Sequence, residues 1–134
     1  MTGARYLLDT HILVWAMAAP ERLSAAARAV LTDDGNELAY STLSFFEAGI
    51  KQSIHPGVRL FDFATIEADC ERAGLARLDA RAAHAAVLAT LPLHHRDPFD
   101  RMLVAQASAE GMRLLTADGQ LASYGAAVAF VGST

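Results

Sequence analysis

The segment DPFDRMLVAQASAEGMRLL, residues 97–115, contains the signals of a helix and of the strand that follows it. Asp97 suits a helix N-cap, and the proline after it suits the first helical position, where no amide hydrogen is needed. Gly111 is of the residue type that ends helices, because glycine tolerates a left-handed backbone. The segment therefore predicts a helix over residues 97–110 and a short apolar strand over residues 113–115.

The alternation of strand and helix continues along the chain on both sides of this segment. Further short apolar strands are predicted at residues 6–8, 38–40, 75–78 and 127–131. Further helices are predicted over residues 12–17, 25–31 (with Ser24 as N-cap), 42–53 and 60–73, and from Ala80 onward with Asp79 as N-cap. Short strands that alternate with helices favour an α/β fold in which helices flank a parallel sheet.

Length and composition are those of one ordinary domain. The chain has 134 residues, 53% of them apolar, so residues 1–134 are expected to form a single domain with a true core. Cys70 is the only cysteine, which excludes a disulfide framework and a cysteine-based zinc site. No stretch approaches the roughly 20 apolar residues that span a bilayer, and no secretory signal is evident. We therefore expect a cytoplasmic protein that does not enter membranes.

Four acidic residues follow strands of the predicted sheet. Asp9 comes directly after the first strand, and Glu47 lies in the helix after the second. Asp100 lies in the first turn of the long helix, and Asp118 comes three residues after the fourth strand. Because ligand sites in parallel sheets lie beyond the carboxyl ends of the strands, all four acids are expected to face the same site.

Each acid also has a purely structural explanation. Asp9 suits a cap of the first helix, and residues 44–47 have the pattern of a capping box. Asp97 and Asp100 together form a good helix start, and Asp118 with the following glycine suits a turn. Taken one at a time, these explanations are favoured over a functional role.

Two observations favour a shared site over four separate structural roles. Glu47 and Asp100 each share a helical face with three apolar residues: Leu43, Ile50 and Ile54 for Glu47, and Leu103, Val104 and Ala107 for Asp100. Such stripes face the core, where an uncompensated carboxylate is costly. No lysine or arginine is placed to serve all four acids, so a divalent cation is the expected counter-charge. Ligands that are all oxygen suit Mg²⁺ or Mn²⁺ better than zinc.

The net charge of −4 argues mildly against a nucleic-acid partner, because non-specific nucleic-acid binders are usually basic. Setting the four acids aside from the total of fifteen leaves eleven acidic against eleven basic residues, so the negative charge is local to the site. Five residues near the acids are candidate phosphate contacts, with an ordinary solvated side chain as the alternative for each: Lys51, Arg96, Arg101, His94 and His95.

Four segments now stand out, in order along nearly the whole chain: Leu7–Thr10, Ser44–Lys51, His95–Ala107 and Leu114–Asp118. Together they resemble the PIN-domain family, and within it the VapC-type toxins that carry an Asp-Pro-Phe-Asp-Arg segment. The longest of the four is the most specific. The resemblance implies an α/β/α sandwich around a mostly parallel sheet of about five strands.

The resemblance also implies an activity, a cofactor and partners. It implies an endoribonuclease that depends on Mg²⁺ or Mn²⁺, cleaves RNA and acts as the toxin of a toxin–antitoxin pair. It further implies a homodimer and a small antitoxin protein that blocks the site, often through a basic side chain near the acids. The matching positions make Asp9, Glu47, Asp100 and Asp118 the catalytic, metal-binding cluster.

Within this cluster we expect Asp9 and Asp100 to hold the principal metal. Glu47 and Asp118 would complete its shell through water, position the nucleophile or help to hold a second metal. Because clustered carboxylates resist ionising together without metal, activity is expected to fall at mildly acid pH.

Three further residues have secondary roles in this hypothesis. Asp97 is expected at the rim of the site, as a helix cap first and a metal ligand second. Thr10 and Thr116 match positions where family members often carry a hydroxyl near the metal-bound water.

Three other functional classes fit parts of the sequence. A metal-free nuclease would use histidines, with His11 close to Asp9 and His94–His95 close to Asp100, but no two histidines are paired at a defined spacing. A receiver-like signalling domain would need a lysine after a late strand, whereas the only lysine is Lys51 in a helix. The main alternative is a catalytically silent PIN-like domain that binds RNA or a protein partner, although such a domain is expected to lack one of the acids.

Overall fold

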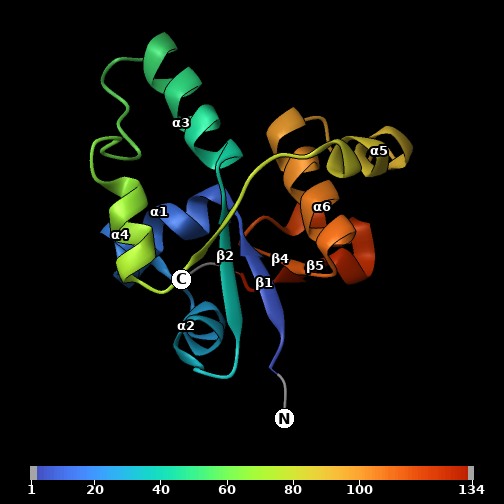
Figure 1. Ribbon diagram of the computed structural model, residues 1–134, viewed down its shortest axis with the longest axis horizontal. Helices are drawn as coiled ribbons and strands as arrows, with labels where there is room; N and C mark the ends of the chain where they lie inside the picture. Colours follow the sequence, from blue (N-terminus) through green and yellow to red (C-terminus); the bar gives the residue numbers. More distant parts are fainter. Residues whose placement is uncertain (1–2, 133–134) are drawn as a thin grey trace.

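The computed structural model describes residues 3–132 and contains a five-stranded, all-parallel sheet in the order β3-β2-β1-β4-β5 (Figure 1). The strands are β1 (Arg5–Leu8), β2 (Glu37–Ser41), β3 (Ala76–Leu78), β4 (Arg113–Thr116) and β5 (Val128–Phe130). The predicted α/β fold with a parallel sheet of about five strands is therefore confirmed. The chain builds the sheet outward from β1 to β3 and then from β4 to β5, so the strand order reverses between β1 and β4.

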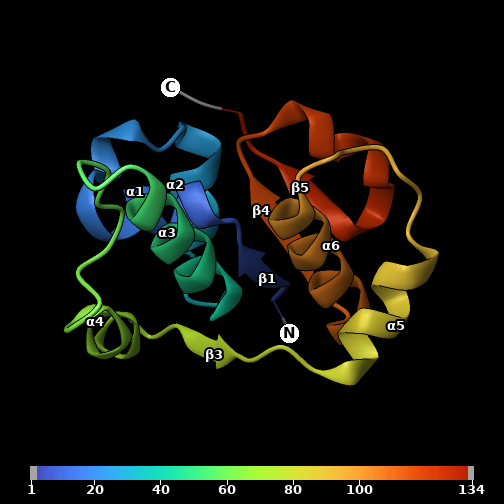
Figure 2. The ribbon, with the colours of Figure 1, turned by 90° about the horizontal axis from the view of Figure 1, so that it is seen from above.

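Helices cover both faces of the sheet (Figure 2). One side carries α1 (Thr10–Ala18), the short 3-10 helix η1 (Pro20–Arg22), α2 (Ala25–Thr32), α3 (Leu43–Ile54) and α4 (Ile66–Arg72). The other side carries α5 (Ala82–Thr90), α6 (Pro98–Glu110) and the 3-10 helix η2 (Gly119–Ala127). Helix α3 projects past the carboxyl ends of the strands (Figure 1). Within residues 3–132, no helix is long and apolar enough to cross a membrane.

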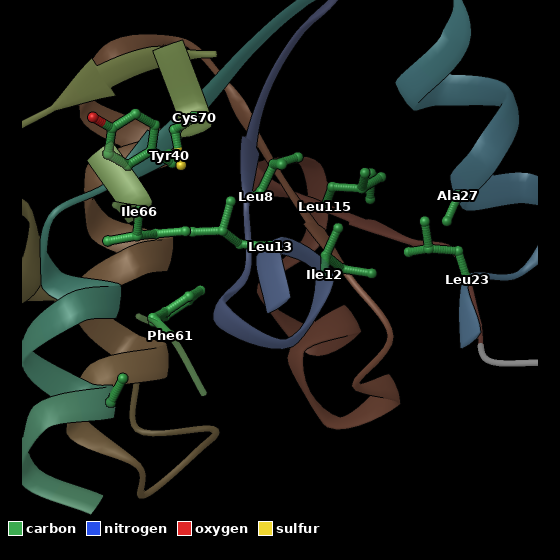
Figure 3. Packing of buried hydrophobic residues seen from close by; sticks show 12 residues of the cluster. Leu8, Ile12, Leu13, Leu23, Ala27, Tyr40, Phe61, Ile66, Cys70 and Leu115 are labelled. Carbon is green, nitrogen blue, oxygen red and sulfur yellow. The ribbon is translucent and has the colours of Figure 1, made fainter. Parts of the chain in front are cut away.

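Alternation along each strand divides the core into two layers. The layer against α1, α2 and α4 contains Leu8, Ile12, Leu13, Tyr40, Ile66, Cys70 and Leu115 (Figure 3). The layer against α6 and η2 contains Leu7, Ala39, Leu103, Val104, Leu114 and Leu121. Because full burial of a leucine contributes about 1.5–3 kcal/mol, packing on both faces holds the carboxyl ends of β1 and β4 in place.

Local signals explain where several helices begin and end. The Asp97 carboxylate accepts the backbone N–H groups of Phe99 (2.9 Å) and Asp100 (3.2 Å), as predicted for the N-cap of α6. Gly111 ends α6 with a φ of +69°, in the left-handed region that glycine adopts freely. The Ser24 hydroxyl caps α2, also as predicted.

The helix predicted over residues 60–73 is shorter than its apolar spacing indicated. Only α4 is helical there, because Phe61 enters the core from an irregular segment while Phe63 stays 45% exposed. The Asp62 carboxylate accepts the Ala64 N–H at 3.0 Å, so a local turn replaces the expected first helical turns. The prediction for residues 60–65 was wrong.

The helix predicted behind Asp79 also begins later. Asp79 forms an ion pair with Arg77 (3.4 Å) and does not cap a helix. Helix α5 begins at Ala82, and the ring of His84 accepts the Arg81 backbone N–H at 3.0 Å. The His84 ring therefore accepts a backbone N–H at the start of α5, the capping role that was expected of the Asp79 carboxylate.

Candidate metal-binding site

Asp9 lies where the strand order reverses, between β1 and α1, and is 5% exposed. Its backbone N–H donates to the carbonyl of Leu115 in β4 (3.0 Å), and its carboxylate caps α1 by accepting the Thr10 N–H (2.8 Å). The other carboxylate oxygen accepts the Thr116 hydroxyl at 2.6 Å. Burial raises the pKa of Asp9, and these hydrogen bonds oppose the rise only in part. The residue is thus both a helix cap and a buried acid at the strand edge.

Glu47, on the second turn of α3, lies against the N-terminus of α1 and is also 5% exposed. Its Oε1 accepts the Thr10 hydroxyl at 2.7 Å, and its Oε2 lies 3.0 Å from the Lys51 Nζ. Because the single hydroxyl hydrogen of Thr10 goes to Glu47, the Ser44 hydroxyl 2.8 Å away donates to Thr10. Both carboxylate oxygens of Glu47 are therefore engaged.

This arrangement corrects two expectations about α3. Ser44 does not form a capping box with Glu47, because its hydroxyl is bound to α1 instead. The face that Glu47 shares with two isoleucines does not face the core, since Ile50 is 47% and Ile54 65% exposed. The N-terminus of α1, and not the core, buries Glu47.

Asp100 lies in the first turn of α6, and its side chain is 17% exposed. The apolar stripe that continues from it along α6 is fully buried, as predicted. Burial raises the pKa of Asp100 to about 8, and the rise is increased by the negative charges of Asp9, Asp97, Glu47 and Asp118. Carboxylates on α3 and at the N-terminal ends of α1, α6 and η2 therefore share one electrostatic environment.

Asp118 and His95 contact each other next to Asp100. Asp118 caps η2 by accepting the Gln120 N–H with one oxygen, and its other oxygen lies 3.2 Å from the His95 Nε2. The same nitrogen lies 3.5 Å from a carboxylate oxygen of Asp100. The sequence pattern indicated His95 only as a phosphate contact or an acid–base group. Its place two residues before the cap Asp97 was the available signal for this contact.

The sequence of this chain matches a known protein family. The family model for the PIN domain matches residues 6–127, from β1 through η2. The chain belongs to the PIN-domain family. A relative of this PIN domain is ribonuclease VapC22 of Mycobacterium tuberculosis, 31% identical over 121 residues that cover 88% of this chain and 90% of the relative. The predicted family and the resemblance to VapC-type proteins are confirmed as distant homology.

Solved structures share the fold at lower identity. VapBC2 from Rickettsia felis, bound to a DNA fragment from its promoter, aligns with a TM-score of 0.65 and 15% identity over 97% of this chain and 99% of the other. A toxin–antitoxin complex from Klebsiella pneumoniae aligns with a TM-score of 0.65 and 14% identity over 98% of this chain and 100% of the other. At these identities the likeness supports the PIN fold.

The basic side chains near the acids of this PIN domain differ in their contacts. Lys51 is paired with Glu47. The Arg101 guanidinium donates to the Leu91 carbonyl at 3.1 Å, and its Nε is buried without a hydrogen-bond partner. Arg101 therefore binds the backbone at the end of α5, in the connection to α6. This structural contact does not support its predicted role as a phosphate contact. Arg96 is exposed in the loop before α6, as a phosphate contact would be.

The donor set of the PIN domain fits a divalent cation. Burial first, and then the negative charges of the neighbouring acids, raise the pKa of Asp100, and a bound cation would favour its ionised form. Asp9, Asp100 and Asp118 could supply carboxylate oxygens, which suit Mg²⁺ or Mn²⁺. The Thr10 and Thr116 hydroxyls orient neighbouring acids by hydrogen bonds.

Proposed function

We propose that this PIN domain is a metal-dependent endoribonuclease that hydrolyses RNA phosphodiesters as the toxin of a toxin–antitoxin pair. The observation that carries the proposal is the group of carboxylates around Asp100, whose pKa is raised to about 8. Ionised carboxylates that lie this close together repel one another unless a proton or a cation neutralises them, and divalent cations held by carboxylates support phosphodiester hydrolysis. The relative named as a ribonuclease supports RNA as the substrate class.

In this proposal, Asp9 and Asp100 are the principal ligands of the cation. Glu47 acts through water, since its oxygens are engaged by Thr10 and Lys51, and Asp118 completes the shell. The chemistry that such a cation supplies is an activated water nucleophile and neutralisation of charge on the phosphate.

The threonine hydroxyls prepare the acids for this role. Thr116 donates to the Asp9 carboxylate (2.6 Å) and accepts the Asp118 backbone N–H (3.0 Å), so it links the ends of β1 and β4. Asp97 accepts two backbone N–H groups at the start of α6, which holds Asp100 in the first helical turn. We therefore assign positioning roles to Thr116 and Asp97 and metal binding to the acids that they hold.

Protein partners are the second part of the proposal. The two solved structures described above are VapBC2 and a toxin–antitoxin complex. On this chain, Phe46, Ile50, Ile54 and Phe63 are 45–65% exposed, and Phe46, Ile50 and Phe63 line a groove of about 380 Å³ along α3. An apolar surface of this kind is typical of an interface. We expect a cognate antitoxin to cover it, and a homodimer that light scattering would detect.

The test is RNA cleavage by purified protein freed of antitoxin, with Mg²⁺ or Mn²⁺ and with chelator. Asp9→Asn and Asp100→Asn are compared with wild type and with Asp34→Asn, which changes an exposed aspartate in the turn before β2. Metal-dependent cleavage that both site variants lose while folded, and that the control keeps, supports the proposal. Cleavage that survives chelator or both site substitutions contradicts the metal mechanism. If no RNA is cut under any condition, the silent PIN-like domain is the better description.

A further inference from the structure

His95, in the loop before α6, is held in place at its backbone and at its ring. Its backbone N–H donates to the Tyr124 hydroxyl at 3.2 Å, and the His94 N–H donates to the same oxygen at 3.1 Å. Its ring Nδ1 accepts the Asp97 backbone N–H at 3.0 Å. The side chain is 12% exposed, so His95 is not an ordinary solvated loop residue.

The hydrogen bond at Nδ1 decides what the other ring nitrogen can do. A ring nitrogen that accepts an N–H carries no proton, so the proton of the neutral His95 ring lies on Nε2. Nε2 therefore faces the carboxylates of Asp118 (3.2 Å) and Asp100 (3.5 Å) as a hydrogen-bond donor. A protonated nitrogen offers no lone pair to a metal, although these three side chains lie close enough together to form a ligand group.

We propose that His95 is a positioning residue that holds Asp100 and Asp118 at the spacing the cation needs, and that it is not itself a ligand. This inference rests on the proposed metal-dependent function and extends it beyond the acidic cluster. Asp100 belongs to α6 and Asp118 to the start of η2, and His95 contacts both. A donor between two carboxylates reduces their repulsion, so less reorganisation accompanies cation binding.

The spacing of the motif follows from the same contacts. Asp97 uses its backbone N–H to orient the His95 ring and its carboxylate to accept the Asp100 N–H (3.2 Å). Asp97 thus orients both His95, two positions before it, and Asp100, three positions after it. Asp118, just after the C-terminal end of β4, contacts the same His95 ring.

The experiment measures Mn²⁺ affinity by calorimetry for wild type, His95→Ala, His95→Asn and His95→Gln. Glutamine places an amide N–H near the position of Nε2, whereas asparagine reaches only to the position of Nδ1. We expect the alanine and asparagine variants to bind Mn²⁺ about 10–100-fold more weakly, and the glutamine variant to recover most of the loss. Circular dichroism with chelator present verifies that each variant is folded.

A spectroscopic measurement separates positioning from ligation. Electron spin-echo spectroscopy of the Mn²⁺-loaded protein detects a directly bound imidazole nitrogen. We expect no such signal from His95 in the wild type. A nitrogen signal that disappears in His95→Gln overturns the proposal, because it makes His95 a ligand.

Comparison with the acid variants separates this inference from the proposed function. If Asp9→Asn and Asp100→Asn lose Mn²⁺ binding while folded His95→Ala keeps wild-type affinity, the His95 inference fails and the metal site stands. If the acid variants bind Mn²⁺ as wild type does, the proposed metal site itself is wrong. Weakened binding in His95→Ala with recovery in His95→Gln supports the inference.

Discussion

Asp100→Asn is expected to stabilise the metal-free protein while removing its metal site. The Asp100 side chain is 17% exposed, and burial together with four neighbouring carboxylates raises its pKa to about 8. Asparagine has nearly the same shape and carries no charge. The substitution therefore removes a repulsive, poorly solvated charge while leaving the cap of α6 by Asp97 intact.

The magnitude follows from the pKa of Asp100. A rise from 3.8 to about 8 corresponds to an upper limit of about 6 kcal/mol, at about 1.4 kcal/mol for each pH unit. Water that reaches the exposed part of the side chain reduces this figure. We expect about 1–3 kcal/mol at pH 8.5, which for a domain of this size raises Tm by about 3–10 °C.

The effect must also depend on pH in a defined direction. Between pH 4 and pH 8 the folded protein keeps a proton on Asp100 that the unfolded chain has lost. The contribution of Asp100 to the stability of the wild type therefore decreases as pH rises through this window. The stability difference between Asp100→Asn and wild type should increase from pH 5 to pH 8.5.

Thermal unfolding in chelator from pH 5 to pH 8.5 measures this difference, with Asp34→Asn as the control for loss of an exposed charge. Added Mn²⁺ should raise the Tm of the wild type but not that of Asp100→Asn. A variant less stable than wild type at pH 8.5, or a stability difference that does not change with pH, would show that Asp100 is not a destabilising buried charge.

Three further predictions concern the same elements. Thr116→Val should lower the free energy of unfolding by about 1–3 kcal/mol in urea, because it removes the hydroxyl bound to the buried Asp9. His84→Ala should cost a similar amount, since the buried ring binds Glu110 at 2.9 Å and joins α5 to α6. Mn²⁺ affinity should fall by up to about 100-fold from pH 8 to pH 6, because Asp100 must lose a proton to bind metal.

Matched controls keep these outcomes specific. Thr90→Val removes an exposed hydroxyl at the end of α5, and His55→Ala removes an exposed histidine after α3. Neither should change stability by more than about 0.5 kcal/mol. Equal losses in a control and its partner variant, or an Mn²⁺ affinity that is independent of pH, would contradict the corresponding prediction.

Much of the fold could be predicted from the sequence because its signals are local. The start and end of α6 depend on Asp97 and Gly111, which act on backbone groups within a few residues of themselves. The short apolar strands followed from runs of three to five residues, and all five are present. The prediction failed at residues 60–65, where helical spacing of apolar residues competed with a turn held by Asp62.

Part of the candidate site could be predicted for the same reason. An acid within a few residues of the end of a parallel strand lies near the carboxyl edge of the sheet, which places Asp9, directly after β1, and Asp118, two residues after β4. The position of Asp100 in the first turn of α6 could be predicted because it lies three residues after the N-cap Asp97. Glu47 was selected for a face of α3 that turned out to be exposed, so its burial has a different cause from the one that indicated it.

The elements, the parallel α/β class and the acids at the strand ends are specified locally in the sequence, because they depend on neighbouring residues. The hydrogen bond from Thr116 to Asp9 joins residues 107 positions apart, and it forms only because the tertiary packing brings these residues together. The same is true of the contact of His95 with Asp118 and of Thr10 with Glu47. Such hydrogen bonds, and the desolvation that raises the pKa of Asp100, arise from which segments pack together, and sequence spacing does not encode that packing.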